Sequence, residues 1–282
     1  MKMKRLLVLI LFLISVVAVG QERGTTVPQG TSIPGLGGLP GLNGAGFFEF
    51  GGSYSHLSKT DFSTRFAPWG DAYLRGLMSG GNNKFNAELI RQVHYSDIGW
   101  FYSLGWTRIW SPDWYTEVSA GSSTRGFFLP KFRTDAFVNR KLLSRKQLIL
   151  TGGFGYDKSK TVNTATRVTA AGTYYFEHPF VVQGGVTWTH ANPGSILARS
   201  QYLAVTQGHE KEHFITLRAE IGREGYELIG PQTSLFNFGI HNYSANWRQW
   251  LGVKWGFNMA FENENNFSYH RYGGSLGFFM DF

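Results

Sequence analysis

Two residues that could act together in catalysis stand two positions apart in "HYS", His94 and Ser96. Residues with this spacing share one face of a β-strand. Some lipid A deacylases use such a His-x-Ser pair together with a glutamate. Here the pair shares its face with Asn86, Glu88 and Gln92, the more polar face of that stretch, whereas a site that cuts lipids should face the membrane. No glutamate falls at a matching position on a neighbouring stretch. We therefore interpret the pair as a polar contact and predict no catalytic residues.

A second cluster, "GHEKEH" at 208–213, places His209, Glu210, Glu212 and His213 close together in the chain. Imidazole and carboxylate groups are common zinc ligands. The segment is expected to form a short turn, where polar residues are ordinary, and it lacks the helical i, i+4 spacing of a zinc helix. We therefore predict no metal and no cofactor. The sequence also has no phosphate-loop spacing, catalytic triad or CxxC pair, and it contains no cysteine.

Charged residues that fall on the less apolar face of their segments form the third set. An arginine that faces lipid at the bilayer midplane costs ~2–4 kcal/mol, so these side chains should point away from lipid. Inside a barrel they would either form salt bridges that brace the wall or line a channel or binding cavity. The set is Arg75, Glu88, Arg133, Asp135, Arg167, Arg218, Glu220, Arg248 and Glu262.

Alternating segments of roughly ten residues would position these groups. In "WGFNMAFE", Trp255, Phe257, Met259 and Phe261 oppose Gly256, Asn258, Ala260 and Glu262, which is the two-residue period of a half-buried strand. Fourteen such segments can be counted from residue 45 onward. They begin near Ala45, Gly70, Lys84, Trp100, Trp114, Phe132, Gln147, Asn163, Phe180, Ala198, Glu212, His241, Trp255 and His270.

The connections between these segments are expected to alternate in length. Short turns such as "GGNN" (80–83), "SPD" (111–113) and "QGHE" (207–210) alternate with longer stretches such as 58–68, 123–131 and 224–238. Short turns at one end and long loops at the other are typical of an outer-membrane barrel. We predict a closed antiparallel transmembrane β-barrel of about 14 strands, with 12 as the alternative. A soluble sandwich or propeller would not need the alternation.

The last residues, "YGGSLGFFMDF", read as the final strand. Tyr272, Gly274, Leu276, Phe278, Met280 and Phe282 form its apolar row, and the chain ends on an aromatic residue. In lipid every backbone amide needs a partner, so this strand must pair with the first. Trp114, Trp250 and Trp255 flank short turns and are expected to join the same interfacial aromatic belt. The row resembles the sorting signal of outer-membrane proteins, so Tyr272, Phe278, Met280 and Phe282 are predicted to form an assembly signal.

The N-terminus predicts export. "MKMKRLLVLILFLISVVAVG" has a basic start, an apolar run and a small-residue end, which indicates a signal peptide at 1–20. Its removal takes away Lys2, Lys4 and Arg5 and lowers the net charge from +8 to +5, which gives no indication of nucleic-acid binding. Residues 21–44 are rich in Gly and Pro and are expected to be flexible, either as a linker or as a plug in the lumen. The barrel is predicted for 45–282.

Several longer stretches carry a resemblance to a known family: "YSHLS...PWGDAYLRG", "GFFLPKFRTDAF", "YLAVTQGHEKEHFITLR", "GREGYELIGP" and "WRQWLG...WGFN". Over residues 47–282 the chain resembles the YaiO family of outer-membrane barrels. The resemblance implies a barrel in the Gram-negative outer membrane. It implies no reaction, ligand or site residues.

These observations leave two function classes. The first is a non-enzymatic barrel with a polar, charged lumen that acts as a channel, a surface-binding protein or an export-associated barrel. The second is an outer-membrane enzyme that modifies lipid or lipopolysaccharide. The expected partners are outer-membrane lipid, lipopolysaccharide and the barrel-assembly machinery. No nucleic acid is expected, a periplasmic partner stays open, and a monomer is favoured.

Overall fold

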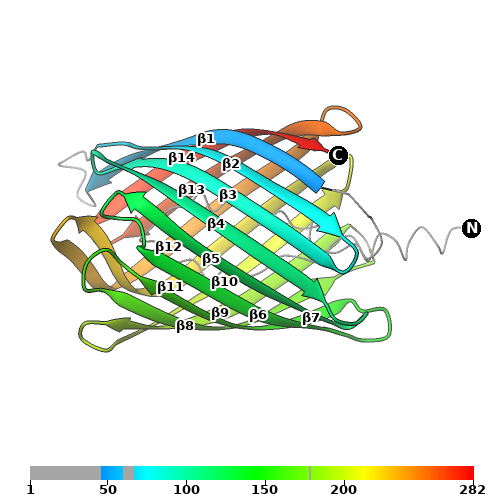
Figure 1. Ribbon diagram of the computed structural model, residues 1–282, viewed down its shortest axis with the longest axis horizontal. Coiled ribbons are helices and arrows are strands. Elements are labelled where there is room, and N and C mark those ends of the chain that lie inside the picture. The colour runs from blue at the N-terminus through cyan, green and yellow to red at the C-terminus, as the bar shows by residue number, and fades with distance from the viewer. Residues whose placement is uncertain (1–45, 60–66, 178) are drawn as a thin grey trace, which may run out of the picture.

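The computed structural model describes residues 46–59, 67–177 and 179–282. The predicted signal peptide (1–20) and Gly/Pro segment (21–44) lie outside the described residues. Fourteen antiparallel strands close into one barrel (Figure 1). They are β1 (Gly46–Lys59), β2 (Trp69–Gly80), β3 (Asn83–His94), β4 (Asp97–Ile109), β5 (Trp114–Arg125), β6 (Phe132–Leu142), β7 (Leu148–Lys158), β8 (Thr164–Tyr175), β9 (Phe180–Asn192), β10 (Ile196–His209), β11 (His213–Gly230), β12 (Thr233–Trp250), β13 (Trp255–Asn266) and β14 (Tyr269–Asp281).

The predicted barrel and the count of fourteen strands are confirmed, and the alternative of twelve is wrong. Each strand pairs with its chain neighbours, and β14 closes the sheet by pairing with β1. At the seam the backbone N–H of Gly46 donates to the carbonyl of Phe282 at 3.1 Å, and the N–H of Phe282 donates to the carbonyl of Gly46 at 3.0 Å. The last strand is therefore paired along the seam. An open sheet edge would leave its backbone N–H and C=O groups without hydrogen-bond partners in hydrocarbon.

Alternation along each strand gives the wall an apolar outside and a polar inside. On β13, Trp255 and Phe261 are 51% and 61% exposed, whereas Asn258 between them is buried. A strand of about 12 residues, tilted by ~40°, spans about 30 Å, which matches the hydrocarbon core. Among the described residues, no helix has the length and hydropathy needed to cross a bilayer.

The two ends of the barrel differ. The end where β1 begins and β14 finishes is called the terminal end, and the opposite one the hairpin end. At the terminal end the described turns are short, such as 81–82 and 210–212. The expectation of long loops at the other end is wrong in part, because 95–96, 231–232 and 267–268 are equally short. Residues 224–238, expected as a loop, instead pair as the ends of β11 and β12. The predicted start of β12 at His241 is therefore too late.

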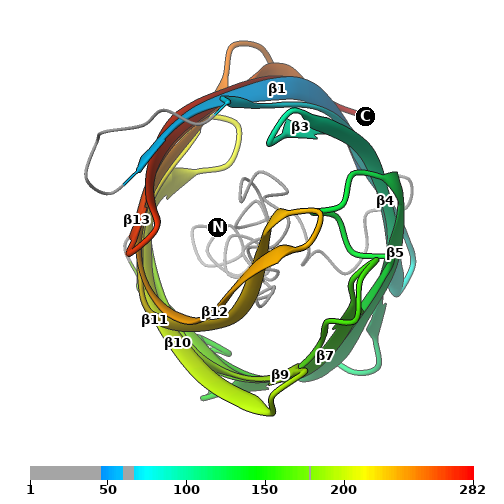
Figure 2. The same cartoon turned by 90° about the vertical axis from the view of Figure 1, so that its left-hand side faces the viewer.

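The extended β11–β12 hairpin does not continue straight along the wall. Figure 2, which looks onto the hairpin end, shows it bending across the opening of the barrel. The bend begins at Gly222, whose φ of 149° is one that other residues rarely adopt. A Cβ there would lie 2.4 Å from the carbonyl oxygen of Arg199. Beyond the bend, Gly225 approaches β9 so closely that a Cβ would lie 2.7 Å from the Cβ of Ala191.

Two sequence-based placements need correction. Trp250 is not in the outer aromatic belt: it is 5% exposed and packs inside against Phe214 and Phe279. Trp250 lies two residues after Arg248 on β12, so the two side chains share the inward face. The position next to a turn predicted the outer belt, but the side-chain alternation of the strand places the ring inside. Trp114 and Trp255, at 40% and 51% exposed, do face outward.

Candidate functional site: the charged lumen

The nine charged residues predicted to face inward all lie on the inward face of their strands. The structure does not gather them into one site. Most of them belong to three groups that also include acidic and basic residues not selected from the sequence, and Arg218 and Glu220 form a separate pair. We call these groups the terminal cluster, the β6–β8 cluster and the hairpin cluster, and each is built from several strands.

The terminal cluster surrounds Glu49 of β1, which is fully buried. Its Oε1 accepts hydrogen bonds from Arg75 Nη2 at 2.7 Å and from the Tyr73 hydroxyl at 3.1 Å. Its Oε2 accepts from Asn258 Nδ2 at 2.6 Å and from Arg248 Nη1 at 3.3 Å. One carboxylate therefore links β2, β12 and β13 across the seam that closes the barrel.

Arg248 extends this cluster toward the terminal end. Its guanidinium lies 3.4 Å from the ring centroid of Phe279 and 4.9 Å from that of Trp250. Its Nη2 lies 3.7 Å from Asp281 Oδ1. Asp281 also pairs with Lys211 and accepts a hydrogen bond from the Trp250 indole at 2.9 Å. Aromatic rings and paired charges together fill this part of the lumen wall.

The β6–β8 cluster lines a different part of the wall. Arg167 Nη2 donates to Asp135 at 2.9 Å, and its Nη1 pairs with Asp157. Arg133 donates to the second oxygen of Asp135 at 2.9 Å. Gly155 lies beneath them, because a Cβ there would lie 2.5 Å from Asp135 Oδ1 and 2.8 Å from Arg167 Nη2. The glycine leaves the space that the arginine head occupies.

Of the predicted inward charges, Arg218 and Glu220 form a separate pair, with Nη2 to Oε2 at 3.0 Å on one strand. The guanidinium also lies 3.8 Å from the Tyr202 ring centroid. Arg218 does not meet Arg248, because Arg218 lies opposite Ser244 and Arg248 opposite Phe214. Glu88 stands opposite Arg75 in the β2–β3 register.

The hairpin cluster lies at the other end of the lumen. Arg271 Nη2 donates to Glu264 at 2.5 Å and to Glu262 at 2.9 Å. The Tyr269 hydroxyl lies 3.1 Å from Glu264 and 2.9 Å from Glu227 of the β11–β12 hairpin. The predicted inward residue Glu262 thus belongs to a network that reaches the hairpin.

His94 belongs to the same end, but it does not form a catalytic pair with Ser96. Its imidazole Nε2 lies 2.9 Å from Asp71 Oδ1, and the ring stacks between Trp69 at 4.2 Å and Phe128 at 4.5 Å. β3 ends at His94, and Ser96 lies in the following turn with a φ of 64°. The expectation that the two residues share a strand face is therefore wrong, because the strand ends between them.

The "GHEKEH" segment forms the turn between β10 and β11 at the terminal end. Within the segment His209 Nδ1 lies 3.9 Å from Glu212 Oε2, Lys211 pairs with Asp281 outside it, and His213 Nε2 lies 3.2 Å from Gln207. Burial raises the pKa of Glu210 to about 7, and the carboxylate of Asp281 acts in the same direction. Within the part of the chain that the structure describes, no group of three or more His, Cys, Asp or Glu side chains is placed to hold a metal ion.

Three of the residues predicted as an assembly signal lie on the outer face of β14, and Phe282 follows the strand directly. Tyr272, Phe278, Met280 and Phe282 are 50%, 44%, 58% and 56% exposed. They are therefore available to lipid or to a partner protein, and their part in assembly stays a prediction.

Seven charged residues of these contacts were not predicted from the sequence: Glu49, Asp71, Asp157, Glu227, Glu264, Arg271 and Asp281. Alternation could have found most of them: Glu49 stands between Phe48 and Phe50, and Arg271 precedes Tyr272. No carboxylate lies on the outward face of the fourteen described strands, whereas basic residues lie on both faces.

Comparison with known proteins sets this lumen in context. Residues 51–227 match the YaiO membrane beta barrel domain. The chain belongs to this family. It is therefore an outer-membrane β-barrel, as predicted from its sequence. No curated protein sequence matches significantly.

Solved barrels share the fold at low identity. A mutant of the monoaromatic hydrocarbon channel TodX is 7% identical, covers 85% of this chain and 91% of its own, and has a TM-score of 0.59. The toluene transporter TbuX of Ralstonia pickettii is 5% identical, with coverage of 85% and 90% and a TM-score of 0.55. A bacterial polysaccharide outer-membrane secretin is 9% identical, with coverage of 84% and 98% and a TM-score of 0.52. At such identity the likeness concerns the fold alone.

Proposed function

We propose that this YaiO-family barrel is a non-enzymatic channel for small polar solutes, and that its β11–β12 hairpin closes the mouth in the state described here. The observation that carries the proposal is the hairpin bound across the opening of a lumen lined with charge. A hairpin that stayed in line with the wall would leave the opening free.

Several hydrogen bonds hold the hairpin to other parts of the barrel, and the longest of them runs from Asn163 Nδ2 to Ser234 Oγ at 3.4 Å. The Tyr226 hydroxyl donates to Asp157 Oδ2 of β7 at 2.8 Å. Glu227 Oε1 accepts from the hydroxyls of Tyr269 at 2.9 Å and Tyr95 at 3.3 Å. The attachment points on β7, on β14 and in the β3–β4 turn lie well apart around the barrel, so the hairpin crosses the opening. Each bond contributes roughly 0.5–3 kcal/mol net to holding the hairpin. The sum of these contributions is small enough for the hairpin to detach and open the mouth.

A second loop narrows the same mouth. Residues 126–131 connect β5 to β6, and Phe128 and Leu129 are buried against Phe101 of the inner wall. Phe128 also stacks on His94. The backbone N–H of Phe127 donates to Asp97 at 2.9 Å, which fixes the loop in its inward position. The hairpin and this loop together form the closure.

The polar lumen supports a polar solute. Arg218 Nε, Arg248 Nε and Asn258 Oδ1 are buried polar atoms with no hydrogen-bond partner among the described residues. Buried polar groups normally bond to protein or water, so we expect ordered water within the lumen beside these atoms. Because both charge signs occur along the lumen, we expect small polar solutes to pass without a strong preference for anions. TodX and TbuX carry aromatic hydrocarbons according to their names, and this charged wall does not suit such cargo.

The position of His94 gives the lipid-modifying alternative no support. The imidazole points into the lumen, away from lipid, and its partner is Asp71. A site that modifies membrane lipid would need its reactive groups at the outer surface.

Planar-bilayer conductance tests the proposal. We expect the Tyr226→Phe/Glu227→Leu variant to conduct more often or at a higher level than the unaltered protein, because it loses the hydroxyl of Tyr226 and the carboxylate that accepts from Tyr269 and Tyr95. The Gln232→Ala/Thr233→Val variant is the matched control, since both residues lie at the exposed tip. Each protein is measured with and without residues 21–44. If the folded variant with the two hairpin substitutions at 226 and 227 never conducts, either with or without residues 21–44, the channel proposal fails.

A further inference from the structure

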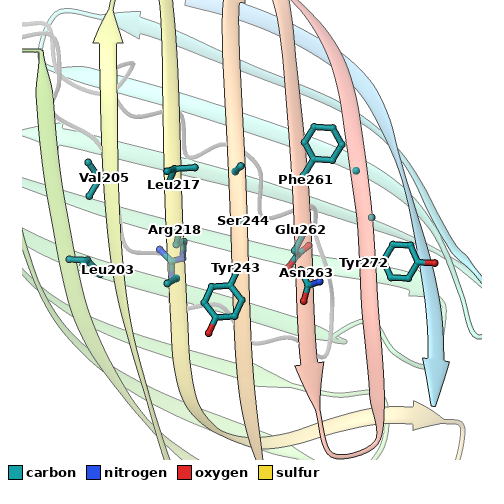
Figure 3. Close-up of a pocket in the computed structure, with 14 residues that line it drawn as sticks. Leu203, Val205, Leu217, Arg218, Tyr243, Ser244, Phe261, Glu262, Asn263 and Tyr272 are labelled. Atoms are coloured by element: carbon teal, nitrogen blue, oxygen red, sulfur yellow. The ribbon is translucent and has the colours of Figure 1, made fainter. Parts of the chain in front are cut away.

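The outer wall of the barrel carries a groove of about 790 Å³ across β10–β14. This volume lies within the ~300–1,000 Å³ that small-molecule sites occupy. Figure 3 shows labelled side chains around it, among them Leu203, Tyr243, Phe261 and Tyr272. Its lining is largely apolar, as expected for a surface that faces lipid.

The strand register explains the groove. One row of outward residues runs across neighbouring strands as Leu203, Ala219, Tyr243, Asn263 and Tyr272. The next row toward the terminal end runs as Val205, Leu217, Ala245, Phe261 and Gly274. Ala219, Ala245 and Gly274 are too small to fill their positions, so the larger neighbours stand as walls around a depression.

A polar row lies directly above the groove, toward the hairpin end. It contains Gln201, His241, Asn265 and His270, which follow one another in the register with Ile221 among them. His270 Nε2 lies 3.3 Å from Asn263 Oδ1, inside the groove. Groups that bond well to a polar headgroup therefore adjoin a cavity that suits hydrocarbon.

Two arginines complete this edge. Ser200 pairs with Gly222, so Arg199 and Arg223 are the next outward residues on β10 and β11. Both are exposed. Arg199 Nη2 donates to Gln201 at 3.1 Å, and Arg223 Nε donates to Asn237 Oδ1 at 2.8 Å, so neither arginine forms an ion pair with a described residue.

The charges of the outer face favour an anion. The described strands bear Arg, Lys and His outward, with their carboxylates turned inward, so no described outward carboxylate competes for these arginines. Arginine pairs well with phosphate through its planar set of donors, and basic clusters next to apolar surface recognise anionic lipid headgroups.

We propose that the groove and the polar edge above it form a binding site for one phosphorylated glycolipid of the outer leaflet, the lipid A part of lipopolysaccharide. Its acyl chains lie in the groove over Ala219, Ala245 and Gly274. A phosphate contacts Arg199 and Arg223, and sugar hydroxyls contact His241 and Asn265. The hairpin end then faces the cell exterior, as short turns at the terminal end predict.

The test measures lipid A binding to the purified full-length mature protein in detergent by native mass spectrometry. Arg199→Gln/Arg223→Gln removes the phosphate contacts, and Ala219→Phe fills the groove. Lys158→Gln and Ala170→Phe are matched controls, because both residues are exposed on the outer face of strands away from the groove. Gel mobility before and after heating reports whether each barrel is folded.

We expect each groove variant to bind lipid A at least tenfold more weakly, and both controls to remain within twofold of the unaltered protein. Dephosphorylated lipid A should bind the unaltered protein as weakly as phosphorylated lipid A binds the double arginine variant. An equal loss of lipid A binding in the Lys158→Gln control would show that the effect comes from general surface charge, and it would overturn the proposed site. Equally tight binding of phosphatidylglycerol would overturn the assignment to a glycolipid.

Discussion

Replacing Arg248 by alanine should destabilise the barrel far more than replacing Arg218, although both are inward-facing arginines. Arg248 has 1% of its side chain exposed and Arg218 has 20%. Arg248→Ala removes a charged hydrogen bond to Glu49, worth ~1.5–3 kcal/mol, and a contact with the Phe279 ring at 3.4 Å, worth ~1–2 kcal/mol when desolvated.

The loss stays below the ~3–5 kcal/mol of a buried charge left alone, because Glu49 keeps Arg75 at 2.7 Å and Asn258 at 2.6 Å. We expect a loss of about 3 kcal/mol in the free energy of unfolding. Arg218→Ala breaks one partly hydrated pair and should cost less than ~1 kcal/mol. The difference of about 2 kcal/mol is roughly thirtyfold in the folding equilibrium.

The assay is reversible urea unfolding in lipid vesicles, followed by tryptophan fluorescence. Arg248→Lys serves as the control, because it keeps the charge and should fall between the alanine variant and the unaltered protein. If Arg248→Ala and Arg218→Ala unfold at the same urea concentration with the same slope, the reasoning from burial and partners is refuted. In that case the terminal cluster contributes little to the stability of the seam.

Three further outcomes are expected. Deletion of Phe282, or its replacement by a charged residue, should lower the amount of heat-modifiable barrel in the outer membrane, and normal amounts would argue against the assembly signal. Cysteines at 231–232 should react with a membrane-impermeant reagent on intact cells and cysteines at 81–82 should not, and the reverse labelling would invert the orientation. The raised pKa of Glu210, about 7 instead of 4.5, means that the folded barrel binds this proton more tightly than the unfolded chain. Its contribution to stability should thus be present below pH 4.5 and be lost as the pH rises through 7, and Glu210→Gln should remove that pH dependence while Glu212→Gln leaves it, as unfolding midpoints at several pH values will show.

Local alternation was enough to locate most strands. The expected starts at Trp114, Phe132, Phe180 and Trp255 coincide with those of the structure, because each begins a run with one apolar and one polar face. Alternation failed at β12, whose predicted start at His241 lies eight positions after Thr233. There the strand has left the wall, so its faces no longer separate lipid from lumen and the two-residue pattern carries no signal.

The partners of the lumen charges could not be predicted in the same way. The face of Arg248 follows from its own strand, but its partner Glu49 lies 199 residues away. That pairing depends on which strands meet when the sheet closes and on the register at the seam. The inward bend of the hairpin was equally hidden, since it depends on Gly222 and on bonds made to β7 and β14.

A reversible disulfide between the hairpin and β9 would test most directly whether the hairpin closes a channel. The chain has no native cysteine, and Cβ atoms at 225 and 191 would be near neighbours at 2.7 Å, so Gly225→Cys/Ala191→Cys needs a shift of about 1 Å to reach the usual ~3.8 Å. The pair is introduced into the Tyr226→Phe/Glu227→Leu variant, and bilayer conductance is recorded before and after reduction. The account predicts low conductance while the disulfide is intact and a rise when it is reduced. Conductance that stays the same, with disulfide formation verified by thiol titration, would contradict it.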